Sequence, residues 1–130
     1  MIVRSLREIE NTPRDVRGTV NGQPWRSMRL LLQSDNMGFS FHITTIPAGS
    51  EHHYEYKNHF ESVYCISGEG SVEDEKTGKR YELRPGTVYA LDKHDKHCLR
   101  TKTEMVFACV FHPALQGDEK HDAEGSYRKR

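Results

Sequence analysis

Apolar and polar side chains alternate in several short stretches of this chain, which is the pattern of β-strands with one buried face. The clearest stretch covers residues 39–46, which begin with aromatic and aliphatic side chains at the odd positions and Ser40, His42 and Thr44 at the even ones. Residues 61–66 alternate in the same way. We therefore expect two strands here, and we expect one face of residues 39–46 to line a pocket.

The remaining apolar stretches are also short, and turn residues separate them. Turns are expected at Asn21-Gly22, at residues 68–70 and at Pro85-Gly86, where Gly, Asn and Pro favour a change of direction. No stretch has the period of an amphipathic helix, so nearly every element is expected to be β. Further strands are expected at residues 1–6, 25–33, 71–75, 79–83, 87–91, 98–101 and 105–111.

Composition narrows the class of protein. The chain has 130 residues, enough for one domain with its own core. Basic and acidic residues number 19 each, without a long basic run, so a small ligand is expected and a nucleic-acid partner is not. Charges near the N-terminus and the lack of a long apolar segment argue against a signal peptide or membrane span, so a cytoplasmic location is expected. The three cysteines lack C-x-x-C spacing, which favours reduced thiols.

Four glycines have a recognisable spacing: Gly49, Gly68, Gly78 and Gly86. This spacing resembles the two motifs of the cupin superfamily, whose members are small double-sheet β-barrels of the jelly-roll type. The resemblance implies an all-β, cupin-type barrel as a single domain over residues 1–130. The polar stretch 113–130 would then be a C-terminal tail, and its composition predicts disorder and little contribution to the core.

The customary metal ligands of the cupin motifs are largely replaced. Glu55 and Lys57 occupy the positions of the usual His-x-His pair, and Tyr89 occupies the last histidine position, whereas the carboxylate Glu61 is kept. With His97, Glu61 and Tyr89 would offer a mixed oxygen and nitrogen set that suits iron, with zinc as an alternative. The opposing interpretation is a metal-free barrel, in which Glu61 lies at the rim, Tyr89 in the core and His97 in a solvated loop.

Three further histidines, His52, His53 and His59, lie close together in the sequence but miss the cupin ligand positions. Adjacent residues of a strand point to opposite faces, so His52 and His53 are not expected to share a site, and we expect none of the three to bind a metal. The cysteines are expected to be inert buried thiols, with a nucleophilic Cys109 as the alternative.

Blocks of residues in order along the chain resemble the ectoine synthase family. The blocks are GFSFH at 38–42, TTI at 44–46, Asn58-His59 with Glu61, VYCI at 63–66, GEG at 68–70, PGT at 85–87, YALD at 89–92, His94-Asp95 with His97, and CVF at 109–111. The resemblance implies a cytoplasmic, homodimeric cupin enzyme, a hydro-lyase that closes Nγ-acetyl-L-2,4-diaminobutyrate into the compatible solute ectoine with loss of water. Such a product points to osmoprotection.

The resemblance also implies roles for individual residues. Glu61, Tyr89 and His97 match the metal ligands of the family, and iron(II) is the expected ion. Glu119, His121 and Tyr89 are the expected catalytic residues, and the tail 113–130 becomes a cover that closes the barrel mouth. The expected substrate-binding residues are Trp25, Arg29, His42, Thr44, Cys109, Phe111, Glu119 and His121. Among them, Arg29 would hold the substrate carboxylate as a fork.

Several positions depart from the family pattern, namely Glu55, His112, Ala114 and Gln116. These departures concern the substrate and the tail more than the fold. Two other classes remain open: a cupin that binds a small solute without catalysis, and a cupin enzyme that acts on a related substrate, such as an isomerase or an iron oxygenase. The missing His-x-His pair argues against an oxygenase, which needs two imidazoles and a carboxylate.

Overall fold

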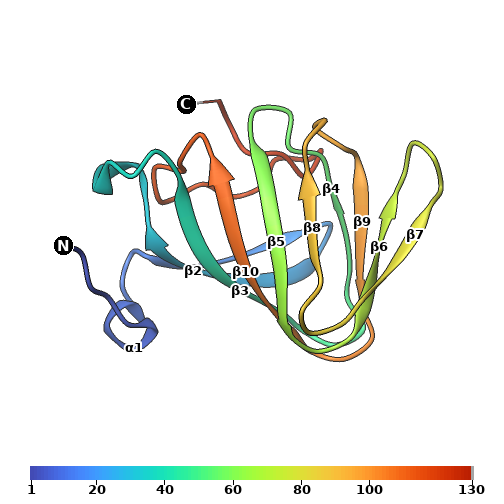
Figure 1. Cartoon of the computed structure of the whole chain (residues 1–130), viewed down its shortest axis with the longest axis horizontal. Helices are drawn as coiled ribbons and strands as arrows, with labels where there is room; N and C mark the ends of the chain where they lie inside the picture. The colour runs from blue at the N-terminus through green and yellow to red at the C-terminus, as the bar shows by residue number, and fades with distance from the viewer. Residues whose placement is uncertain (130) are drawn as a thin grey trace.

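Two antiparallel sheets form the computed structural model of the chain, which describes residues 1–129 (Figure 1). The larger sheet has the strand order β1 (Asp15–Val20), β2 (Gln23–Leu31), β3 (Ser40–Ile46), β10 (Met105–His112), β5 (Phe60–Ser67) and β8 (Val88–Leu91). The smaller sheet has the order β4 (Glu51–Tyr54), β9 (His97–Thr101), β6 (Gly70–Asp74) and β7 (Arg80–Leu83). The predicted all-β double-sheet barrel is confirmed.

The inward faces of both sheets form one core. On β5 the burial alternates as the sequence predicts, and the face with Glu61, Val63 and Cys65 points inward. On β3 the polar face points inward, as the burial of Ser40 and His42 beside the core shows. The core therefore contains polar side chains at its centre, which is where a ligand site would lie.

Two turns require glycine. Asn21 and Gly22 both have positive φ angles, 51° and 77°, the conformation of the hairpin turn that joins β1 to β2. Gly68 packs so closely on β10 that a Cβ atom would lie 2.2 Å from the carbonyl oxygen of Glu104. The glycines that separate the predicted strands thus set the turns and the approach of one strand to another.

The prediction of a strand at residues 1–6 is wrong. The chain begins without a strand and then forms helix α1 (Leu6–Ile9), because Ser5 and Glu8 cap its first turn reciprocally. Arg4 donates to the carboxylate of Asp35 at 2.8 and 3.0 Å, and Asp35 belongs to the short 3-10 helix η1 (Gln33–Asp35). Ion pairing therefore fixes the N-terminal segment beside β2. Among the described residues no helix has the length and apolar character to cross a bilayer.

The tail is ordered, which corrects the prediction from its composition. Residues 113–129 contain no helix or strand, yet Leu115, Glu119, Ser126 and Tyr127 are buried. The tail, red in Figure 1, crosses the end of the barrel and bonds to the segment between β4 and β5, where Glu55 N–H donates to the carbonyl of Gly125 at 3.1 Å. It is therefore part of the core. Arg130, the last residue of the predicted tail, lies outside the described residues.

Candidate active site

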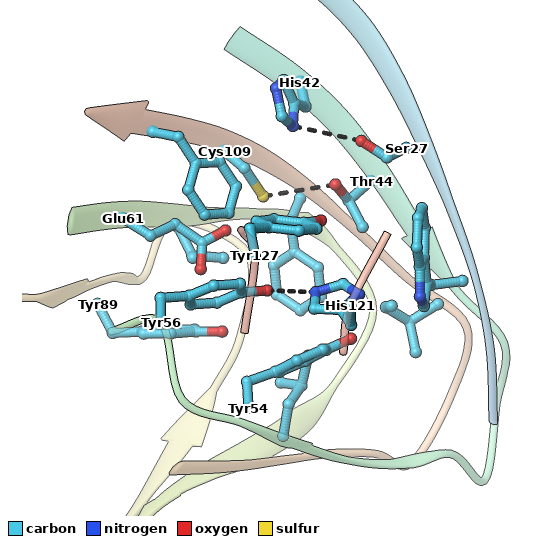
Figure 2. Close-up of a pocket in the computed structure, with 16 residues that line it drawn as sticks. Ser27, His42, Thr44, Tyr54, Tyr56, Glu61, Tyr89, Cys109, His121 and Tyr127 are labelled. Atoms are coloured by element: carbon cyan, nitrogen blue, oxygen red, sulfur yellow. Dashed lines mark hydrogen bonds between the residues drawn. The ribbon is translucent and has the colours of Figure 1, made fainter. Parts of the chain in front are cut away.

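An enclosed cavity lies between the two sheets and beneath the tail (Figure 2). Strands β2, β3, β5, β8 and β10 of the larger sheet contribute to its wall, and Tyr54, Tyr56, His121 and Tyr127 close it from the other side. Its free volume is about 30 Å³, which is roughly the share of one water molecule in the liquid. The described conformation is therefore closed around its own side chains.

The larger sheet places most of the predicted substrate residues on this wall. Antiparallel pairing sets His42 opposite Cys109 and Thr44 opposite Phe107, so the side chains of β3 and β10 meet inside the barrel. The Cys109 thiol donates to Thr44 Oγ1 at 3.6 Å (Figure 2). Six predicted residues line the cavity: Trp25, His42, Thr44, Cys109, Phe111 and His121.

Three cavity residues keep a buried nitrogen that no other group satisfies within residues 1–129. These atoms are Nε1 of Trp25, Nε2 of His42 and Nδ1 of His121. A buried polar atom without a partner is costly, by roughly 1–3 kcal/mol. A polar molecule in the cavity would satisfy these atoms, so the wall has the character of a binding site.

A chain of hydrogen bonds sets the state of His42. Arg29 Nε donates to Ser27 Oγ at 3.2 Å, and Ser27 Oγ lies 3.3 Å from Nδ1 of His42. The Ser27 hydroxyl accepts from Arg29 and still has one proton and one lone pair, so it can either donate to Nδ1 of His42 or accept from it. Burial, aided by the Arg29 charge, lowers the pKa of His42, so the ring is neutral. In the tautomer in which Ser27 donates, His42 offers the N–H of Nε2 to the cavity.

Arg29 and Glu119 do not line the cavity, although both are buried. The guanidinium donates to the carbonyl oxygens of Gly117 at 3.0 Å and Glu119 at 2.8 Å. The Glu119 carboxylate accepts the N–H groups of Gln116 at 2.6 Å and Gly117 at 2.7 Å. In this conformation both side chains hold the tail rather than facing a substrate.

His121 is the tail residue that reaches the cavity. Its Nε2 lies 2.7 Å from the hydroxyl of Tyr56, a contact drawn in Figure 2. Burial, with the positive charge of Arg29 as a lesser cause, lowers the pKa of His121 to about 3. The imidazole is therefore neutral throughout the physiological range and can accept a proton.

The three predicted metal ligands come from both sheets. Glu61 on β5 and Tyr89 on β8 point inward from the larger sheet, since Tyr89 pairs with Val63, two residues from Glu61. His97 on β9 is buried in the smaller sheet, and its ring centroid lies 6.2 Å from that of Tyr89. Tyr89 and His97 also line a wider cleft of about 630 Å³ between the free edges of β7 and β8. Glu61, Tyr89 and His97 therefore lie where the closed cavity meets this open cleft.

The electrostatics of these residues suit a cation. Burial raises the pKa of Glu61 to about 8, a hydrogen-bonding interaction with Cys109 opposes this shift, and no cationic side chain among the described residues contributes to it. Burial also raises the pKa of Tyr89. His97 Nδ1 donates to the carbonyl of Asp95 at 2.8 Å, which leaves Nε2 with its lone pair. An oriented imidazole and a buried carboxylate without a counter-charge fit a bound metal.

Sequence reasoning missed three tyrosines of the site. Tyr127 stacks on His121 with 4.3 Å between ring centroids, and Tyr54 and Tyr56 lie 4.8 and 5.6 Å from the same ring. The alternation in residues 52–56 could have placed Tyr54 and Tyr56 on one inward face. No local pattern marks Tyr127, which is a single aromatic residue in a polar segment.

His52 and His53 lie on opposite faces of β4, as the alternation predicts. His52 points inward and stacks on Tyr54 at 5.4 Å between centroids, whereas His53 is half-exposed on the outer face of the smaller sheet. His59 is buried against the rings of Phe111 and Tyr127 at 6.0 and 6.1 Å. His59 therefore packs behind the cavity wall.

Comparisons with known proteins agree with the family resemblance seen in the sequence. A family model described as ectoine synthase matches residues 1–130. An L-ectoine synthase of Saccharophagus degradans is 56% identical over 127 residues, which cover 98% of this chain and 93% of the relative. The crystal structure of the ectoine synthase from P. lautus is 50% identical with a TM-score of 0.83, covering 90% of this chain and 81% of that one. A Cupin_2 domain of an XRE family regulator from Enterobacter cloacae shares the fold alone, at 17% identity and a TM-score of 0.58 over 68% of this chain and 95% of that one.

Proposed function

The chain belongs to the ectoine synthase family, and on that premise we propose that it closes Nγ-acetyl-L-2,4-diaminobutyrate into ectoine with loss of water. This is the reaction of a hydro-lyase, and the product would serve in osmoprotection. One observation carries the proposal: a neutral imidazole, His121, and a buried carboxylate, Glu61, line a single closed cavity whose wall offers unsatisfied polar atoms. A cavity that leaves little room for water beside the substrate favours a reaction that expels water.

Glu61, Tyr89 and His97 are the residues that would hold the metal of this family, with iron(II) the expected ion and zinc the alternative. The buried carboxyl of Glu61, whose raised pKa a bound cation would lower, and the Nε2 lone pair of His97 support the assignment. Tyr89 would have to lose its phenolic proton, which a cation beside it favours. When bound, such an ion would polarise the acetamide carbonyl and stabilise the departing hydroxyl.

His121 is the residue that we propose to move protons. The α-ammonium group of the substrate must lose a proton before its nitrogen can attack the carbonyl carbon, and His121 is placed to accept it. With its pKa lowered to about 3 the imidazole is a weak base, so it would hold this proton only briefly before passing it to the departing oxygen. The Tyr56 hydroxyl, at 2.7 Å, can donate to Nε2 or accept from it, so Nδ1 can present either a lone pair or a proton. Both protons that leave the amine end on the departing oxygen, which completes one molecule of water.

The other predicted residues act on the shape and position of the substrate. Trp25 and Phe111 would press the flexible chain into the folded conformation that ring closure needs. The N–H of His42 Nε2 would donate to an oxygen of the substrate. Cys109 and Thr44 bond each other, which supports a binding role for Cys109 rather than a nucleophilic one. Burial raises the Cys109 pKa, so the thiol stays protonated.

For Arg29 and Glu119 the geometry supports an indirect role. Arg29 donates to the backbone of the tail, and the Glu119 carboxylate accepts from two backbone amides. We propose that both are positioning residues, which place His121 and Tyr127 over the cavity. Glu119 would then affect catalysis indirectly, by holding the tail in place, and not by contact with the substrate.

The tail must move during turnover. The free volume of about 30 Å³ cannot hold an acetylated diamino acid, and the rings that fill the cavity include His121 and Tyr127 from the tail. Their displacement would admit the substrate, and their return would exclude water. Such a cover is drawn from a segment without regular secondary structure, as is common for enzyme lids.

Homodimer formation and a cytoplasmic location also belong to the proposal. Adjacent outward positions of β5 and β8 expose large apolar side chains, with Tyr64 at 46% and Val88 at 60% exposure, and β8 is an edge strand of its sheet. A second copy of the chain would cover this face. Light scattering of wild type and Val88→Glu tests it, since a monomeric wild type would oppose the proposal.

The proposed cytoplasmic location is supported by the cysteines. All three are free thiols, in keeping with a reducing compartment.

The decisive test is turnover. Purified protein loaded with iron(II) is incubated with Nγ-acetyl-L-2,4-diaminobutyrate, and the cyclic product is followed by NMR, with His121→Asn as the control variant. We expect ring formation by wild type and a large loss in the variant. The second candidate is a solute-binding cupin, and the closed cavity is the single observation in its favour. Saturable binding of the substrate without ring formation would support this second candidate and contradict the first.

A further inference from the structure

Three different ligand atoms converge on the outer face of the smaller sheet, away from the cavity. They belong to Glu51 and His53 on β4 and to Cys98 on β9, and the pairing of β4 with β9 sets His53 directly opposite Cys98. The carboxylate oxygen, imidazole nitrogen and thiol sulfur all lie within 4.8 Å of one another. Alternation turns these side chains outward, whereas Tyr54 and His97 on the same strands face the barrel interior.

The separations of the three atoms match those of ligands around one ion. His53 Nε2 lies 3.0 Å from Glu51 Oε1, and Cys98 Sγ lies 3.8 Å from each of them. The bond lengths of tetrahedral zinc imply about 3.3 Å between nitrogen and oxygen ligands and about 3.6 Å from sulfur to either. The cluster therefore needs only shifts of a few tenths of an ångström to enclose a cation.

The second nitrogen of His53 is already held as it is in metal sites. Nδ1 forms a hydrogen bond to the carboxylate of Glu75, which makes Nδ1 the donor and orients Nε2 toward Glu51. Metal-bound histidines commonly donate their other ring nitrogen to a carboxylate in this way. Nε2 of His53 then either carries a second proton and donates to Oε1 of Glu51, or offers its lone pair to a metal ion that replaces this proton. The carboxylates of Glu75 and Glu51 raise the pKa of His53, so this position favours a positive charge.

We propose that Glu51, His53 and Cys98 form a second site for a divalent cation of the zinc class, separate from Glu61, Tyr89 and His97. Cys98 is buried, and burial raises the pKa of its thiol to about 11, so the ion would have to displace the thiol proton. The resulting thiolate, with an imidazole and a carboxylate, is a donor set that zinc accepts, and a fourth position is left for solvent. Arg100 makes its shorter bond, 2.9 Å, to Glu73 and a longer one, 3.4 Å, to Oε1 of Glu51, so this longer contact is the one that an ion at Glu51 would replace.

The position of this site gives it a structural consequence. β4 has four residues and lies at the edge of its sheet, so β9 is its sole neighbour there. An ion bound by both strands would join them from outside, directly behind the residues that present Tyr54 and His97 to the cavity. The outer site would thus stabilise the wall that carries one of the proposed inner ligands.

Cobalt(II) titration of metal-free protein tests the site, because thiolate bound to cobalt gives a charge-transfer absorption in the near ultraviolet. The titration is done in a Glu61→Ala background, which removes the carboxylate of the barrel site. We expect one equivalent of cobalt to produce the absorption. It should vanish with Cys98→Ser and persist with Cys65→Ser, a buried thiol elsewhere. Glu75→Ala should weaken binding by about 10- to 100-fold.

Zinc provides a second measurement. It should raise the melting temperature of the Glu61→Ala protein and leave that of the Cys98→Ser double variant unchanged. If the serine variant does not fold, His53→Gln in the same background decides, since the His53 side chain is 43% exposed and its loss opens no core cavity. A folded Glu61→Ala protein without the absorption, or an absorption that survives Cys98→Ser, would overturn the proposal.

Discussion

The guanidinium of Arg29 donates to the backbone oxygen of Glu119 at 2.8 Å, across ninety positions of sequence. The two side chains are also 3.8 Å apart as an ion pair, and neither is exposed by more than 1%. Strand β2 therefore anchors the tail through a buried charge. This one contact connects the stability of the fold to the closure of the cavity.

Arg29→Ala should lower the free energy of unfolding by about 3 kcal/mol, because it leaves buried acceptors and the Glu119 charge without a partner. Urea denaturation measures the change. Arg17→Ala, at an exposed position of β1, is the matched control and should change little. Were Arg29 to act only on the substrate carboxylate, its variant would keep the stability of wild type and lose only substrate affinity.

Tyr127→Ala should destabilise the protein by about 3 kcal/mol and reduce turnover, since it removes a buried ring that covers His121 and Phe111. Tyr127→Phe should preserve both properties, because the hydroxyl makes only a 3.5 Å contact with Arg29. Thermal unfolding and product formation are measured on both variants. Equal behaviour of the two would argue that the ring is not the element that closes the cavity.

Glu61→Gln should remove one equivalent of iron from the protein while leaving the β-rich circular dichroism unchanged. The amide has the shape of the carboxylate but lacks the charge that balances a cation. Elemental analysis measures the iron content after the protein has been loaded with iron(II) and desalted. Glu104→Gln, on the surface, is the control. Iron retained at the wild-type level in Glu61→Gln would remove Glu61 from the metal site.

His121→Asn should lower kcat by about two to four orders of magnitude, the usual contribution of a general acid or base. Because burial lowers the pKa of His121 to about 3, its neutral form is already present far below neutral pH. The kcat of metal-loaded wild type should therefore show no midpoint near 6.5. A midpoint there, absent from the residual activity of His121→Asn, would contradict this environment.

The ion pair of Asp35 should make the free energy of unfolding fall in acid. Its hydrogen bond from Arg4 is the largest cause that lowers its pKa, from 3.8 to about 2. The unfolded chain thus binds more protons between these values, so stability is lost as pH falls from about 4 to 2. Asp35→Asn should be less stable at pH 7 and should flatten that slope in acid denaturation. Asp92→Asn, at an exposed site, should retain the wild-type slope.

The sequence predicted what depends on local pattern. Alternation grouped His42 with Ser40 and Thr44 on one face of β3, and Glu61 with Val63 and Cys65 on one face of β5, because a strand fixes which residues share a face. That these faces point inward is seen only in the structure. The N-terminal error was also local. Ser5 and Glu8 have the spacing of a capping box, which outweighed the alternation of the first residues.

What the sequence could not supply depends on contacts between distant segments. The burial of Glu119 and Tyr127 follows from their contacts with Arg29, and composition carries no trace of such partners. Likewise the alternation correctly separated His52 from His53. It could not reveal that Cys98 would lie opposite His53, since that depends on the register between β4 and β9.

The end of the last strand at His112 has a consequence for biosynthesis. Chains are made from the N-terminus, so the ribosome releases residues 113–130 after every strand of the barrel has emerged. Glu61, Tyr89 and His97 can therefore assemble while the mouth is still open. The order of translation therefore allows an ion to reach these residues before residues 113–129 first pack over the cavity.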